Sequence, residues 1–116
     1  MIAGLLVGAY RPACDDRRMT TTALHPGDYL LLTYDYVPDI LQRRDPHRLD
    51  HLEHARAAKH RGLLLNVGAV GSPPTGAVFV FENVDPQEVE AFADGDPYVA
   101  AGLVTARRVQ PWAVVV

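Results

Sequence analysis

The sequence of 116 residues contains a single cysteine, Cys14, which excludes an internal disulfide and a metal site built from several cysteines. Basic residues are not in excess: 11 Lys and Arg stand against 14 Asp and Glu, for a formal net charge of -3. A general nucleic-acid-binding domain has the opposite balance. The mildly apolar residues 1–9 neither reach the length of a membrane span nor follow the basic residues of a secretory signal. We therefore expect a cytoplasmic protein that binds neither nucleic acid nor membranes.

Hydrophobic residues make up 48% of the chain, which is enough to form the core of one small domain. Residues 1–27 show no apolar periodicity, and we interpret them as an N-terminal arm or leader. Met19 is an alternative start, because every domain-like feature lies downstream of it. The predicted domain therefore covers residues 28–116.

Apolar runs and capping signals divide this domain into strands and helices. The clearest helix has Asp45 as a predicted N-cap, Pro46 in its first turn and Gly62 at its end. The expected elements are a strand at 29–37, a helix at 46–61, strands at 63–70 and 77–82 joined by the turn 71–76, a helix to residue 93 with a capping box between Asp85 and Glu88, a helical turn from Asp96 to Gly102, and a strand at 104–116. The order β-α-β-β-α-β predicts an α+β, ferredoxin-like fold, with a four-stranded antiparallel sheet and its helices on one face.

The predicted sheet is apolar on both faces. Residues 29–32 of the first strand and 112–116 of the last are apolar or aromatic at every position. The helices cover one face, and the other would expose a larger apolar patch than a soluble monomer usually tolerates. We expect a homodimer in which the two exposed sheet faces pack together, with Tyr34 and Tyr36 on that face. The alternative is that the arm at 1–27 covers it.

Four of the five histidines lie between residues 47 and 60, and His47, His51 and His54 share one stripe of the predicted helix. Polar helix surface is the expected role of His47, His54 and His60. A metal site is a weaker alternative, because no cysteine accompanies the stripe and three histidines of one helix rarely reach one ion. His51 borders the apolar arc of the helix, so it is the candidate general acid or base, provided that a carboxylate orients its ring.

Two segments carry a resemblance to a known family. Arg48-x-x-His51, with Gly62 eleven residues after the histidine, and the block Asp96-Pro97-Tyr98 followed by Gly102 resemble the YciI-like (YCII-related) family over residues 28–116. The resemblance implies a dimeric α+β barrel of ferredoxin-like domains, and an active-site pair of histidine and aspartate that falls on His51 and Asp96. It also implies activity on small organic molecules, by proton transfer or elimination without a cofactor.

The residues themselves leave alternatives open. Asp96 before Pro97 is typical of a helix cap, and one carboxylate oxygen could cap while the other meets the His51 imidazole. Arg48, one turn before His51, could pair with a substrate carboxylate or be an exposed helix residue. Tyr34 could line the pocket, and Tyr98 is a further candidate contact with the substrate, although a tyrosine at this position is more often a core residue. The predicted function is a metal-free enzyme of the lyase or isomerase type that acts on a small organic acid. The alternative is a non-catalytic ligand-binding or dimerisation module.

Overall fold

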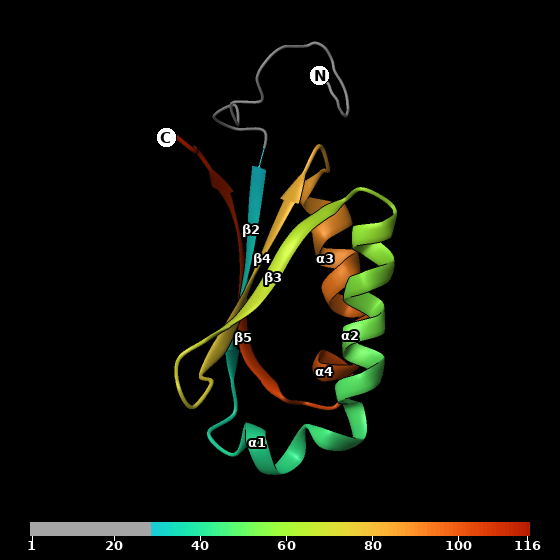
Figure 1. Ribbon diagram of the computed structural model, residues 1–116, viewed down its shortest axis with the longest axis vertical. Coiled ribbons are helices and arrows are strands. Elements are labelled where there is room, and N and C mark those ends of the chain that lie inside the picture. Colours follow the sequence, from blue (N-terminus) through green and yellow to red (C-terminus); the bar gives the residue numbers. More distant parts are fainter. Residues whose placement is uncertain (1–28) are drawn as a thin grey trace.

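The computed structural model describes residues 29–116 (Figure 1). The predicted arm at 1–27 and the alternative start Met19 lie outside the described residues. The elements along the described chain are β2 (Tyr29–Tyr36), α1 (Ile40–Arg43), α2 (Asp45–His60), β3 (Leu64–Val70), β4 (Gly76–Glu82), α3 (Pro86–Asp94), α4 (Pro97–Ala100) and β5 (Val104–Trp112).

The four strands form one antiparallel sheet in the order β3-β4-β2-β5. Helices α2, α3 and α4 lie together on one side of it, as Figure 1 shows. Each of the two helical connections joins strands that are not neighbours in the sheet, β2 to β3 and β4 to β5, so the sheet has the split arrangement of a ferredoxin-like fold. The predicted α+β fold class is confirmed.

Side-chain alternation along the two central strands directs one row of residues toward the helices. On β2 these are Leu30, Leu32 and Tyr34, and their neighbours on β4 include Phe79 and Phe81. The helices contribute a matching set of buried residues: Ala55, Ala58, Val89, Phe92 and Ala93. Because two of these are alanines of α2, that helix packs close against the sheet, and its buried face holds a histidine, His51, beside them.

Tyr34 and Tyr36 lie on the helix side of β2, so their predicted position on the exposed sheet face is wrong. Tyr34 belongs to the core and is 1% exposed, and Tyr36 packs against the same core. Only the first half of the strand is apolar on both faces; Thr33 and Asp35 share the opposite row, so side-chain alternation does indicate that the two tyrosines turn inward. The face away from the helices has half-buried apolar residues at its centre, among them Leu31, Val78 and Val80.

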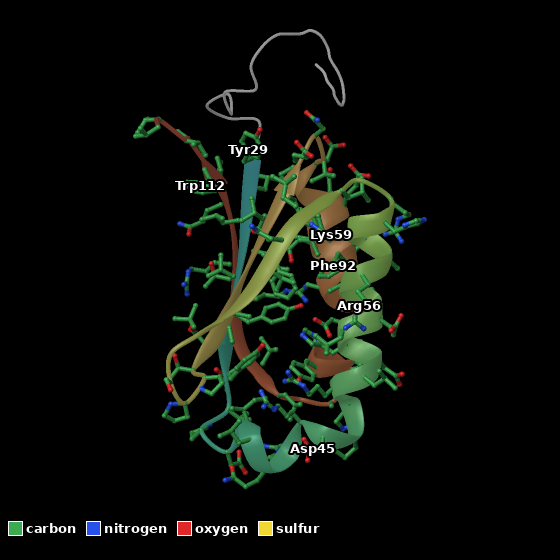
Figure 2. All side chains as sticks on the ribbon, in the orientation of Figure 1. Tyr29, Asp45, Arg56, Lys59, Phe92 and Trp112 are labelled. Atoms are coloured by element: carbon green, nitrogen blue, oxygen red, sulfur yellow. The ribbon has the colours of Figure 1, made fainter. Side chains whose placement is uncertain are left out.

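The start of the long helix differs from the prediction. Helix α2 begins at Asp45 itself, and no side chain caps it. A short helix, α1, precedes it, and Arg44 between the two has a helical backbone conformation. An N-cap residue needs an extended conformation, so the chain has no place for Asp45 to act as one. Figure 2 shows Asp45 at this end of α2.

Other boundaries agree more closely with the sequence. The capping box of α3 is present, with the Asp85 backbone N–H donating to Glu88 Oε1 at 2.9 Å. The last strand ends at Trp112 rather than at residue 116, because Trp112 pairs with Tyr29 and no described strand lies opposite the residues that follow. Among the helices of residues 29–116, none is both long and apolar enough to cross a membrane.

Candidate active site

The predicted pair of His51 and Asp96 forms a buried contact between two helices. His51 lies on the inner face of α2, and Asp96 immediately precedes α4. The Nδ1 atom of His51 is 2.8 Å from Oδ1 of Asp96, although the residues are 45 positions apart. The histidine is 6% exposed and the aspartate 0%. The contact expected from the sequence is therefore present.

Asp96 accepts three hydrogen bonds. Its Oδ1 accepts from the backbone N–H of Tyr98 at 3.0 Å as well as meeting His51, so the predicted N-cap of α4 is also present. Its Oδ2 accepts from the Tyr34 hydroxyl at 2.8 Å. The expectation that one carboxylate oxygen caps α4 while the other meets the imidazole is thus wrong. Oδ1 meets both the Tyr98 N–H and His51, because the Tyr34 hydroxyl donates to Oδ2.

These bonds determine which atoms carry protons. Burial raises the pKa of the Tyr34 phenol far above its ordinary value, and the adjacent negative charge of Asp96 and their hydrogen bond act in the same direction. Tyr34 is therefore a permanent donor to the carboxylate. Since the ionised carboxylate only accepts, the His51 Nδ1 facing it carries a hydrogen, which leaves Nε2 of a neutral ring with a free lone pair. No hydrogen bond within residues 29–116 occupies Nε2.

Two aromatic rings hold the His51 imidazole in place. The Tyr98 ring is stacked on it, with centroids 3.7 Å apart and an interplanar angle of 3°. The Phe79 ring meets it edge-on at 6.3 Å. Tyr98 is 2% exposed and contacts the ring of Tyr36, so it is a core residue, and its contact with a substrate stays a prediction. The imidazole orientation is thus fixed by packing as well as by Asp96.

Two arginines lie close to Tyr98. Arg48 is exposed, one turn before His51, and Arg44 joins α1 to α2. Burial raises the pKa of the Tyr98 phenol, while the charges of Arg48 and Arg44 oppose that increase. The sequence singled out Arg48 but not Arg44, whose proximity depends on the unpredicted helix α1.

The other histidines of the stripe do not join His51. His54 places Nε2 2.7 Å from the backbone oxygen of Phe92 and stacks on that residue's ring, with centroids 4.4 Å apart. Its predicted surface role is therefore wrong, because α3 covers this side of α2; Figure 2 shows Phe92 between the sheet and the helices. His60 is exposed, as expected, and His47 is half-buried. Within residues 29–116, no three His, Cys, Asp or Glu side chains are grouped as metal ligands.

A cavity of about 420 Å³ lies beside Tyr36, and neither His51 nor Asp96 lines it. Tyr36 and Ile40 line it together with mostly apolar residues, including Leu41 and Pro73. Both Tyr36 and Ile40 also pack against Tyr98. The cavity therefore borders the aromatic residues that surround the His51–Asp96 pair, and its volume is typical of a site for a small molecule.

Comparisons with known proteins identify the family and support the fold. The model of the YCII-related domain family matches residues 28–113. One similar solved structure is the 5-chloro-2-hydroxyhydroquinone dehydrochlorinase of Burkholderia phenoliruptrix in complex with 2,5-dihydroxybenzoquinone. It is 25% identical, the alignment covers 72% of this chain and 92% of that chain, and the TM-score is 0.62. A comparison with curated proteins finds no match.

Proposed function

Because the chain belongs to the YCII-related domain family, we propose that it is a small-molecule enzyme in which His51 and Asp96 move a proton without a cofactor. The buried hydrogen bond between these two residues is the observation that carries the proposal. The substrate class is a small organic acid, and the reaction is a proton transfer, an isomerisation or an elimination. The similar dehydrochlorinase supports the elimination variant, in which a base removes a proton as chloride leaves.

In the proposed mechanism, His51 Nε2 is the base. Asp96 accepts from Nδ1–H, keeps the ring in that tautomer and stabilises the imidazolium that forms when Nε2 takes a proton. A base of this kind accelerates a reaction by about 10²–10⁴-fold, so other groups must stabilise the developing negative charge. In this proposal Arg48 pairs with a substrate carboxylate or enolate, and its exposed position near Tyr98 supports that role. Tyr34 holds Asp96 through Oδ2 and acts as a positioning residue, rather than as part of the pocket wall.

Hydrogen–deuterium exchange at carbon tests the proton-transfer step directly. The protein is incubated in D₂O with a panel of small acids that have an acidic C–H, and exchange is followed by NMR. Chloride release from 5-chloro-2-hydroxyhydroquinone is measured in parallel. We expect at least one compound to exchange or react, with a loss of at least about 100-fold in His51→Gln. The matched variant His60→Gln changes an exposed histidine of the same helix and is expected to match the wild type.

Two results would overturn the catalytic proposal. One is an unchanged rate in His51→Gln. The other is a panel in which compounds bind to the wild type and to His51→Gln but neither protein turns any of them over. The second result would identify a ligand-binding module, which tolerates the loss of a base.

We further propose that the enzyme is a cytoplasmic homodimer, joined through the sheet face away from the helices. The support is the half-buried apolar centre of that face, which includes Leu31, Val78 and Val80. Light scattering is expected to give twice the chain mass for the wild type and a smaller species for Val80→Asp. Leu49→Asp alters an exposed apolar residue of α2 and is expected to leave the mass unchanged. A wild type of single-chain mass would contradict the dimer.

A further inference from the structure

Two buried polar atoms near the His51–Asp96 pair make no hydrogen bond of normal geometry within residues 29–116, although the Arg48 guanidinium lies close to one of them, the Tyr98 hydroxyl. They are Nε of Arg44 and the hydroxyl oxygen of Tyr98. Buried polar groups in folded proteins are nearly always hydrogen-bonded, and an exception often marks a place for a water, an ion or a ligand. Both groups are donors: the arginine N–H donates only, and the phenol has a hydrogen to give.

The surroundings of these two atoms are rich in donors and poor in free acceptors. The charges of Arg48 and Arg44 both reach the Tyr98 phenol. Neither arginine forms an ion pair with a carboxylate of the described chain. Asp96 is the buried carboxylate beside them, and both of its oxygens already accept hydrogen bonds. A ligand with an anionic oxygen would supply an acceptor that these donors do not find in the described chain.

The position of this donor group relative to His51 follows from the ring stack. The Tyr98 and His51 rings are parallel, with centroids 3.7 Å apart, and the phenol hydroxyl projects beyond the six-membered ring. The hydroxyl therefore lies beside the imidazole, close enough for one small molecule to contact both groups. The 420 Å³ cavity has room for one ring or a short chain. Tyr36 and Ile40, which pack against Tyr98, line it, whereas Tyr98 itself does not.

We propose that the Tyr98 hydroxyl, the Arg44 Nε–H and the Arg48 guanidinium together bind one carboxylate or enolate group of the ligand, next to His51. The inference rests on the proposed function, because it places the charged end of the acid whose proton His51 moves. Arg44 and Tyr98 are then specificity-determining residues, which select an anion over a neutral molecule of the same shape. Arg48, being exposed, contributes charge at the entrance.

Binding of benzoate and of its neutral isostere benzamide tests this subsite. Affinities are measured by NMR titration, in a buffer without carboxylate or phosphate, for the wild type and three variants. Tyr98→Phe removes only the hydroxyl and keeps the ring that stacks on His51. Arg44→Gln removes the buried donor together with its charge. Arg43→Gln, which alters the neighbouring exposed arginine paired with Asp39, is the matched control for the charge change.

We expect benzoate to bind the wild type at least about tenfold more tightly than benzamide, and Tyr98→Phe and Arg44→Gln each to weaken benzoate by about tenfold or more. Arg43→Gln is expected to bind benzoate like the wild type. Without ligand, the Tm of Tyr98→Phe is expected to change little, because the lost hydroxyl makes no hydrogen bond of normal geometry in the described chain. That result would separate a ligand-binding hydroxyl from a structural one.

The subsite is contradicted if the wild type does not bind benzoate, if benzamide binds equally well, or if both variants bind like the wild type. His51→Gln keeps all three proposed donors and is expected to retain benzoate binding. Its rate of proton exchange decides the catalytic proposal separately. Failure of the subsite and failure of the proposed function are thus read from different measurements.

Discussion

Replacement of Tyr34 by Phe and of Asp96 by Asn, singly and together, tests the energetic role of the hydrogen bond between them. Tyr34→Phe removes a buried donor that lies 2.8 Å from Oδ2 of Asp96. Hydrogen bonds to charged groups contribute about 1.5–3 kcal/mol, so we expect a loss of about 2 kcal/mol in the free energy of unfolding. The ring remains and still packs edge-on against Phe79, so no cavity adds to this loss.

Asp96→Asn changes the acceptor of the same hydrogen bond. The amide keeps one acceptor oxygen for the His51 and Tyr98 N–H groups, but it presents an NH₂ group to the Tyr34 hydroxyl. The remaining bonds lose their charge assistance, and the removal of a buried charge offsets part of that loss. We expect a net loss of about 2–3 kcal/mol. The double variant should lose less than the sum of the two, by about 1–2 kcal/mol, because the shared bond is absent from both single variants.

Urea unfolding at pH 7, followed by circular dichroism at a single protein concentration, gives the four free energies. Tyr36→Phe is the control: it removes the same atom from the same face of β2, and no hydrogen bond of the Tyr36 hydroxyl forms within residues 29–116. It should cost less than about 0.5 kcal/mol and be additive with Asp96→Asn. Additivity of the Tyr34 and Asp96 changes within about 0.5 kcal/mol would refute the coupling.

Three further predictions concern other contacts. Burial and Asp96 raise the pKa of Tyr34 above its ordinary value of 10.0, so above that pH the unfolded chain releases a proton that the folded chain keeps. Stability should therefore fall as the pH rises above about 10, and Tyr34→Phe should reduce that slope, measured by urea unfolding, by about 1.4 kcal/mol per pH unit. An added methyl group at Gly76 overlaps the Tyr34 carbonyl oxygen, whereas one at Gly68 meets no atom within 4 Å. Gly76→Ala should lower stability by about 1–3 kcal/mol and have a lower Tm than Gly68→Ala. Equal Tm values for the two variants would contradict the clash. His54→Ala removes a bond to a carbonyl of α3 and an aromatic stack, for a loss of about 1–3 kcal/mol by urea unfolding. His60→Ala, at an exposed position, should stay within about 0.5 kcal/mol of the wild type.

Local signals predicted most of the fold. The capping box of α3 and the Pro-rich turn between β3 and β4 act within a few residues, so their sequence determines their structure. Helix α1 was missed because four residues, Ile40–Arg43, are too few to show a helical period. That omission caused the error at Asp45, since a residue that continues a helical backbone cannot be an N-cap.

The sequence predicted a residue of the candidate site only where the residues next to it in the chain identified it. Asp96 has a cap signature in the sequence, and the family resemblance joined it to His51. Alternation with Thr33 and Asp35 indicates that Tyr34 faces inward, but nothing in the sequence pairs its hydroxyl with Asp96, 62 residues away. His54 shares a stripe with His51, but helical periodicity does not show that α3 lies against it.

Asp96 links the stability of the fold to the geometry of the site, because one atom serves both. Its Oδ1 accepts from the backbone N–H of Tyr98, in the first turn of α4, and it also meets His51. The Tyr98 ring stacks on that same imidazole. A shift of the carboxylate would therefore displace the helix start, the stacked ring and the proposed base together. Loss of activity in an Asp96 variant would thus not distinguish lost chemistry from lost local structure. His51→Gln leaves the bond between Asp96 and Tyr98 in place, so it is the variant in which proton transfer can fail while the turn before α4 stays folded.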